Sequence, residues 1–161
     1  MNKFKNKTEQ GEYINCLIQE GLIVPVKITC KLIENEMSKF DKTKNIFLVD
    51  GFPRNEENYN GFCENFQSSA NIVCIIFLEC PQDVCVNRIE SRGKSSGRVD
   101  DNIVSLVKRF NTYNIETVPL INSIQKENKV KICRVDANIS REIVFKNLAI
   151  ELDKILIEIY D

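Results

Sequence analysis

The 161-residue chain contains no histidine. This absence excludes the Ser/His and Cys/His pairs of nucleophilic catalysis and removes the commonest metal ligand of proteins. Any catalysis must therefore use carboxylates, lysines and arginines. The chain also has no surplus of either charge, since 22 lysines and arginines stand against 23 aspartates and glutamates. No general field attracts nucleic acid or acidic membranes, so an anion site must be local.

Long apolar runs are missing as well. No stretch has the roughly 20 apolar residues of a membrane-spanning helix, and no apolar stretch follows the polar residues 1–7 to form a secretory signal. We expect a soluble intracellular protein, cytoplasmic and also compatible with the nucleus, without nucleic-acid or membrane partners. The length and the hydrophobic content of 43% are typical of one globular domain.

The seven cysteines include no C-x-x-C pair. A disulfide framework usually needs an even number of cysteines, and a zinc site usually needs ligands at short fixed spacing. Four of the cysteines lie within or beside apolar runs: Cys16, Cys74, Cys80 and Cys133. We therefore favour reduced thiols in the core over a disulfide or zinc framework.

Three short apolar runs predict buried strands, at residues 46–49, 72–78 and 130–135. Helical spacing of apolar residues predicts helices before, between and after these runs. Alternating strands and helices predict an α/β fold in which a parallel sheet is covered by helices on both faces.

Cap residues set the expected ends of these helices. Gly21 is expected to end the first helix in a left-handed conformation. The other signals are caps at Asn55 and Ser140, a cap at Asp100 or Asp101, Pro81 in a first turn, and a break at Pro119.

The first predicted strand ends in the hexapeptide Asp50-Gly51-Phe52-Pro53-Arg54-Asn55. Ligands of a doubly wound sheet sit outside the carboxyl ends of its strands, where an aspartate can hold magnesium or its waters. Gly51 permits close backbone approach, Pro53 stiffens the turn, and Arg54 offers a planar fork for phosphate. An ordinary strand-to-helix turn with a surface arginine explains the hexapeptide equally well.

A second group of cations surrounds a glycine-containing loop: Arg88, Arg92, Lys94, Arg98 and Arg109. Charge runs usually form a solvated helix face. The alternative is a lid that folds over a polyanion and excludes water. Gly93-Lys94-Ser95 imitates the end of a Walker A loop, but it follows a helix and lacks the first glycine, so we reject that motif.

Residues 49–55 and 92–102 together resemble the adenylate kinase superfamily and, within it, the UMP-CMP kinases. The resemblance extends from about Gly11 to near Leu152. It implies a P-loop kinase type of α/β fold and one domain over 1–161, with a monophosphate-binding part at about 11–40 and a lid at about 92–102. It also implies transfer of the γ-phosphate from ATP to UMP or CMP, with Mg²⁺, by a monomer.

The same resemblance assigns residues to roles. The acceptor UMP or CMP would be bound by Leu22, Ile23, Val24, Gly51, Phe52, Pro53, Arg54, Asn58, Arg98 and Arg109. ATP would be bound by Arg92 and by the backbone from Ala137 to Ile139, and the transferring phosphates would be held by Arg88, Arg98 and Arg109. Asp50 would organise the waters of magnesium. Asn58 resembles the base reader of pyrimidine-specific members, because adenylate kinases typically have glutamine there.

Family members begin with a strand, a Gly-x-Pro-Gly-x-Gly-Lys-Gly-Thr loop and an arginine-bearing segment, and none of these occurs in the 161 residues. The resemblance therefore implies an N-terminally truncated domain without its donor-phosphate loop or the central strand of a 2-3-1-4-5 sheet. We expect it to be inactive, and either unstable or rearranged so that strands 46–49 and 72–78 pair directly. A noncatalytic nucleotide-binding or regulatory relic is the alternative function. A third possibility, a purely structural partner subunit, is disfavoured because so many arginines remain at the positions where the family binds its ligands.

Overall fold

The computed structural model describes residues 8–41, 45–94 and 101–160. The elements are α1 (Glu9–Gln19), α2 (Val26–Met37), α3 (Glu56–Phe66), β1 (Cys74–Glu79), α4 (Gln82–Gly93), α5 (Ile103–Thr112), the π-helix η1 (Tyr113–Thr117), α6 (Val118–Glu127), β2 (Lys131–Asp136) and α7 (Arg141–Tyr160). Within these ranges, no helix combines the length and the apolar character needed to cross a membrane.

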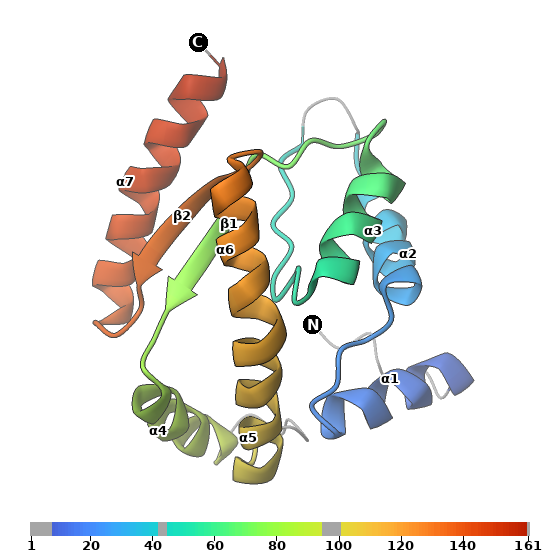
Figure 1. The fold of residues 1–161 in the computed structure, drawn as a ribbon, viewed down its shortest axis with the longest axis vertical. Helices are drawn as coiled ribbons and strands as arrows, with labels where there is room; N and C mark the ends of the chain where they lie inside the picture. The colour runs from blue at the N-terminus through green and yellow to red at the C-terminus, as the bar shows by residue number, and fades with distance from the viewer. Residues whose placement is uncertain (1–7, 42–44, 95–100, 161) are drawn as a thin grey trace.

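The sheet confirms the predicted α/β fold class. β1 and β2 pair in parallel, with Cys74 opposite Lys131 and Glu79 opposite Asp136. α7 covers one face, where Cys133, Val135 and Ile155 form a buried cluster. The intervening Arg134 points to the other face and donates to side chains of α6 there. Figure 1 shows α7 and α6 on opposite sides of the two strands.

A second unit consists of α2 and α3, which pack side by side at the far side of the molecule from α7 (Figure 1). Gly61 on α3 permits this close approach. A Cβ atom added there would lie 2.5 Å from Cγ2 of Val26, well inside van der Waals contact.

We predict that Gly61→Ala lowers the free energy of unfolding. Overpacking usually costs about 1–3 kcal/mol, which outweighs the roughly 1 kcal/mol that alanine gains over glycine in a helix interior. Adding Val26→Ala should restore most of the loss, because it removes the opposing methyl groups. Urea unfolding of the wild type, both single variants and the double variant measures the coupling. A Gly61→Ala variant as stable as the wild type would contradict the packing argument.

Several predicted helix ends are confirmed. Gly21 has a φ of 67°, and the amides of Gly21 and Leu22 bond to the carbonyls of Ile18 and Leu17, a complete Schellman ending. Asn55 caps α3 by accepting from the amide of Asn58. Ser140 likewise accepts from an amide in the first turn of α7.

The predicted strand at 46–49 is wrong. These residues form no regular structure, and Ile46 and Leu48 are 65% and 82% exposed. The described sheet contains β1 and β2 alone. The expected direct pairing of 46–49 with the 72–78 run, which became β1, therefore does not occur. An extended run becomes a strand only when a neighbour supplies hydrogen bonds along its length. The expected instability of the 161 residues stays a prediction.

Two boundary predictions are also wrong. Asn102 caps α5, by accepting from the amide of Ser105, in place of either aspartate. Pro119 does not break the helix, since α5, η1 and α6 continue into one another (Figure 1). The π-turn of η1 immediately precedes α6, whose first turn contains Pro119. A first-turn proline needs no amide donor and is tolerated.

Candidate functional site

The turn between residue 50 and α3 holds Arg54 against its own backbone. Gly51 has a φ of 72°, a conformation that favours glycine. Nε of Arg54 donates to the carbonyl of Gly51 at 2.8 Å. A Cβ atom on Gly51 would lie 3.2 Å from Nη2 of the same arginine. Phe52 and Pro53 complete the turn through a cis peptide bond. The sequence therefore builds a compact platform for an exposed guanidinium.

Asn58 joins this platform to the start of α3. Its side chain is buried, with the whole residue 3% exposed. Oδ1 of Asn58 accepts from the backbone N–H of Arg54 at 3.4 Å. The backbone N–H of Asn58 donates to Oδ1 of Asn55. The predicted phosphate ligand and the predicted base reader thus share one turn. Their roles toward a nucleotide stay predictions.

Thr117 contacts the Arg54 turn, and the sequence did not reveal this contact. From η1, its Oγ1 donates to the backbone carbonyl of Arg54 at 2.7 Å, across 63 positions of the chain. π-helices are rare and frequently occur at functional sites. A threonine inside a helical run has no distinctive pattern, so only the folded chain shows that it helps position the Arg54 turn.

The segment Leu22–Val24 follows the end of α1 beside α5. A Cβ atom on Gly21 would lie 3.0 Å from Cβ of Lys108 and 3.4 Å from Cγ of Arg109. Ser105 donates to the carbonyl of Gln19 at 2.9 Å and fixes this contact. The structure therefore holds the end of α1, which the 22–24 segment follows, against the helix that bears Arg109. Leu22 is exposed, and Ile23 and Val24 are partly buried.

Arg88 lies on α4 and reaches the loop at the carboxyl edge of the sheet. Its Nη1 donates to the carbonyl of Ala137 at 2.7 Å, and its Nη2 donates to the carbonyl of Ile139 at 3.3 Å. These carbonyls belong to the loop between β2 and α7. The structure thus joins Arg88 to the backbone that the family resemblance assigns to ATP.

Arg92 forms a bidentate pair with Asp101 across the predicted lid, with Nε 2.9 Å from Oδ2. The Asp101 side chain is fully buried. In place of the predicted helix cap, this aspartate therefore orients an arginine. Arg98 lies outside the described residues.

Asp50 is exposed at the end of the irregular 45–49 segment, so it does not close a strand as predicted. Within the described parts of the chain, no group of three or more Cys, Asp or Glu side chains could hold a metal ion. Kinase magnesium is commonly held by one or two carboxylates, its waters and the substrate phosphates. One exposed carboxylate beside the Arg54 turn fits that kind of site.

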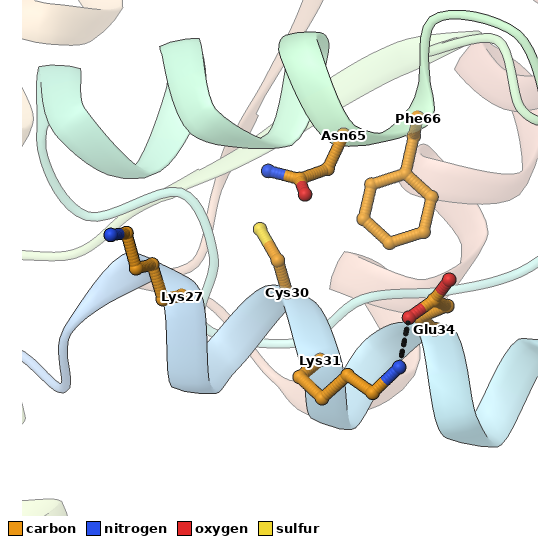
Figure 2. A pocket seen from close by; sticks show the side chains of 6 residues that line it. All are labelled: Lys27, Cys30, Lys31, Glu34, Asn65 and Phe66. Atoms are coloured by element: carbon orange, nitrogen blue, oxygen red, sulfur yellow. Dashed lines mark hydrogen bonds and ion pairs between the residues drawn. The ribbon is translucent and has the colours of Figure 1, made fainter.

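A pocket between α2 and α3 is separate from this arrangement. It is lined by Lys27, Cys30, Lys31, Glu34, Asn65 and Phe66. Figure 2 shows Asn65 and Phe66 directed from α3 toward Cys30 on α2, with Lys31 paired to Glu34 at 2.7 Å. None of these residues is among the predicted ligands. The pocket opens near the end of α3, whereas Arg54 and Asn58 lie at its start.

Comparison with known proteins gives a consistent result. Residues 1–129 match the family model described as adenylate kinase. The chain is 42% identical to the UMP-CMP kinase of Homo sapiens over 154 residues, which cover 93% of this chain and 78% of the human protein. It is 41% identical to the UMP-CMP kinase of Danio rerio over 153 residues, or 93% and 77% of the two chains. The UMP-CMP kinase of Gallus gallus is 41% identical over 150 residues, or 91% and 76%.

Proposed function

Because this chain belongs to the adenylate kinase family of nucleoside monophosphate kinases, we propose that it acts on pyrimidines. In the proposed reaction an oxygen of the UMP or CMP phosphate attacks the γ-phosphorus of ATP. The bond to the β-phosphate oxygen breaks, and ADP leaves with UDP or CDP as the other product. The place of such a reaction is cytoplasmic pyrimidine nucleotide metabolism, and the enzyme acts as a monomer.

The turn that joins Arg54 to Asn58 is the observation that carries this proposal. A planar guanidinium can hold two oxygens of a monophosphate at once. The side-chain amide of Asn58 has both a donor and an acceptor for a base edge. Its Oδ1 already accepts from the backbone N–H of Arg54, and an amide oxygen has a second lone pair. Phosphate and base would then be bound by one rigid unit supported by α3.

The remaining cations supply the electrostatics of transfer. Phosphoryl transfer asks a protein mainly to position its reactants and to place cations around the equatorial oxygens. We assign Arg88, Arg98 and Arg109 to the transferring phosphates and Arg92 with Ile139 to ATP. Magnesium, when bound with ATP, would neutralise phosphate charge, and Asp50 would hold its waters.

Binding selectivity tests the pyrimidine assignment. Titration calorimetry on the 161-residue chain, or on that chain preceded by the N-terminal strand and loop of the family, should give Kd values for UMP and CMP at least about tenfold below that for AMP, a difference of about 1.4 kcal/mol. Asn58→Gln should reduce this ratio, because a longer side chain moves the amide. Asn60→Gln, at an exposed position of the same helix, is the matched control. Tighter binding of AMP than of both pyrimidines would reject Asn58 as the base reader.

Thr117 provides a second test of the acceptor platform. Thr117→Val keeps the shape and removes the hydrogen bond to the Arg54 carbonyl, which should cost about 1 kcal/mol. We expect a Kd for UMP raised about fivefold. Thr117→Ser keeps the hydroxyl and should bind as the wild type does. Equal losses in both variants would mean that the methyl group of Thr117, and not its hydroxyl, supports the turn.

A further inference from the structure

Two cysteines meet where β1 passes into α4. Cys80 immediately precedes the cap residue Pro81, and Cys85 lies one turn into the helix, where its amide donates to the carbonyl of Pro81 at 3.1 Å. Residues just before a helix cap and at the fourth helical position commonly pack against each other. Accordingly, Sγ of Cys85 lies 3.9 Å from the carbonyl oxygen of Cys80. Both side chains are partly exposed.

The sulfur of Cys80 also contacts Arg88. Nη1 of Arg88 lies 3.5 Å from Sγ of Cys80 and 2.7 Å from the carbonyl oxygen of Ala137. One guanidinium therefore joins the Cys80 thiol to the loop after β2. A chemical change at this sulfur acts directly on an arginine that holds that loop.

The other cysteines lack this combination of proximity and access. Cys30 and Cys133 are buried, and the partly exposed Cys74 packs against the cluster under α7 that contains Cys133, so its neighbouring thiol lacks access. Cys16 is exposed on α1, and Cys63 lies on α3, away from the sheet. Burial, followed by a hydrogen bond with Cys80, raises the pKa of the Cys85 thiol above its ordinary value. A raised pKa lowers the fraction of Cys85 that is present as thiolate, so we assign the first attack on peroxide to Cys80, whose sulfur contacts the Arg88 guanidinium.

We propose that Cys80 and Cys85 are a redox-sensitive thiol pair that peroxides convert to a disulfide. In the first step the Cys80 sulfur attacks a peroxide oxygen, which gives a sulfenic acid and releases water, or an alcohol if the peroxide is organic. In the second step the Cys85 thiol displaces the hydroxyl as water and closes the S–S bond. The two thiols lose two electrons, and the peroxide gains them. Thiol reductants reverse the change by exchange.

The consequence is a redox-dependent contact at the carboxyl edge of the sheet. Disulfides in proteins of reducing compartments are usually transient and catalytic or redox-sensing. Closing the bond ties Cys80 to α4 and changes the thiol that Arg88 contacts. This inference does not depend on the proposed reaction, because it concerns thiol chemistry alone.

Peptide mapping tests the pair in the unaltered 161-residue chain. After one equivalent of hydrogen peroxide, the remaining thiols are alkylated and the chain is cleaved before Asp83, which separates Cys80 from Cys85. The fragments on either side of Asp83 should stay joined until a reductant is added, and two of the seven thiols should escape alkylation. Fragment spectra should place the link at Cys80.

Variants sharpen the result. Cys80→Ser and Cys85→Ser should each abolish the joined product, whereas Cys16→Ser and Cys63→Ser should keep it, and circular dichroism checks that each variant is folded. Three outcomes would overturn the proposal. The link could run through Cys63 or Cys74, or the disulfide could join two chains instead of forming within one. Cys85 could also be fully alkylated while Cys16 oxidises. The mapping of the unaltered chain decides the question even if a variant fails to fold.

Discussion

A polypeptide of these 161 residues should transfer no measurable phosphate from ATP to UMP or CMP. The same residues preceded by the strand and glycine-rich loop with which UMP-CMP kinases begin, here called the extended protein, should turn over at about 1–100 per second. Loop amides and a lysine normally hold the donor phosphates in line with the acceptor, and no such loop occurs in the sequence.

The described residues support this expectation. Arg88 donates to the carbonyls of Ala137 and Ile139, and Arg92 is held by Asp101. These contacts position cations where we propose that ATP binds, but they supply no ring of backbone amides for its β-phosphate and γ-phosphate. Nothing else in the described ranges takes that role.

A coupled assay of ADP release measures the difference. The control is the extended protein with the loop lysine replaced by alanine, which should fall back toward the activity of the 161 residues. Kinase-like turnover by the 161 residues alone would show that the arginines suffice. If the extended protein binds UMP and ATP yet transfers nothing, the noncatalytic relic is the better description.

Replacement of Arg54 by lysine should have the next largest effect. In the extended protein, Arg54→Lys should lower kcat/KM for UMP by an amount on the order of 2 kcal/mol, roughly thirtyfold. Nε of Arg54 is held by the Gly51 carbonyl at 2.8 Å, so the fork is fixed on its turn. Lysine keeps the charge, but it loses both the anchoring bond and the second hydrogen bond to phosphate.

Arg141→Lys provides the matched control, because Arg141 is exposed at the start of α7 and has no proposed role. It should leave the kinetics unchanged. Steady-state rates with UMP varied and ATP saturating separate a rise in KM from a fall in kcat. If Arg54→Lys behaves like Arg141→Lys, Arg54 is only a surface residue.

Features encoded within one or two helical turns were predictable from sequence. Gly21 ends α1 and Asn55 caps α3 because each acts on amides or carbonyls a few positions away. The strands β1 and β2 were found within two residues of their ends, since apolar runs bounded by polar residues mark buried strands.

Features that depend on distant partners were not predictable. The 46–49 run has the apolar composition of a buried strand, but no strand in the described sheet pairs with it. Thr117 contacts Arg54 across 63 positions, and Asp101 is recruited by Arg92 although it lies beside the true cap. In each case contacts with residues distant in the sequence decide the conformation or the partner. Local sequence propensity does not encode such contacts.

The specificity of the extended protein tests the central claim most directly. Initial rates with ATP and, in turn, UMP, CMP and AMP give three values of kcat/KM under one set of conditions. We expect both pyrimidine values to exceed the AMP value by at least about tenfold, which corresponds to about 1.4 kcal/mol. A kcat/KM for AMP equal to or above that for both UMP and CMP would contradict the assignment of this chain as a pyrimidine nucleotide kinase.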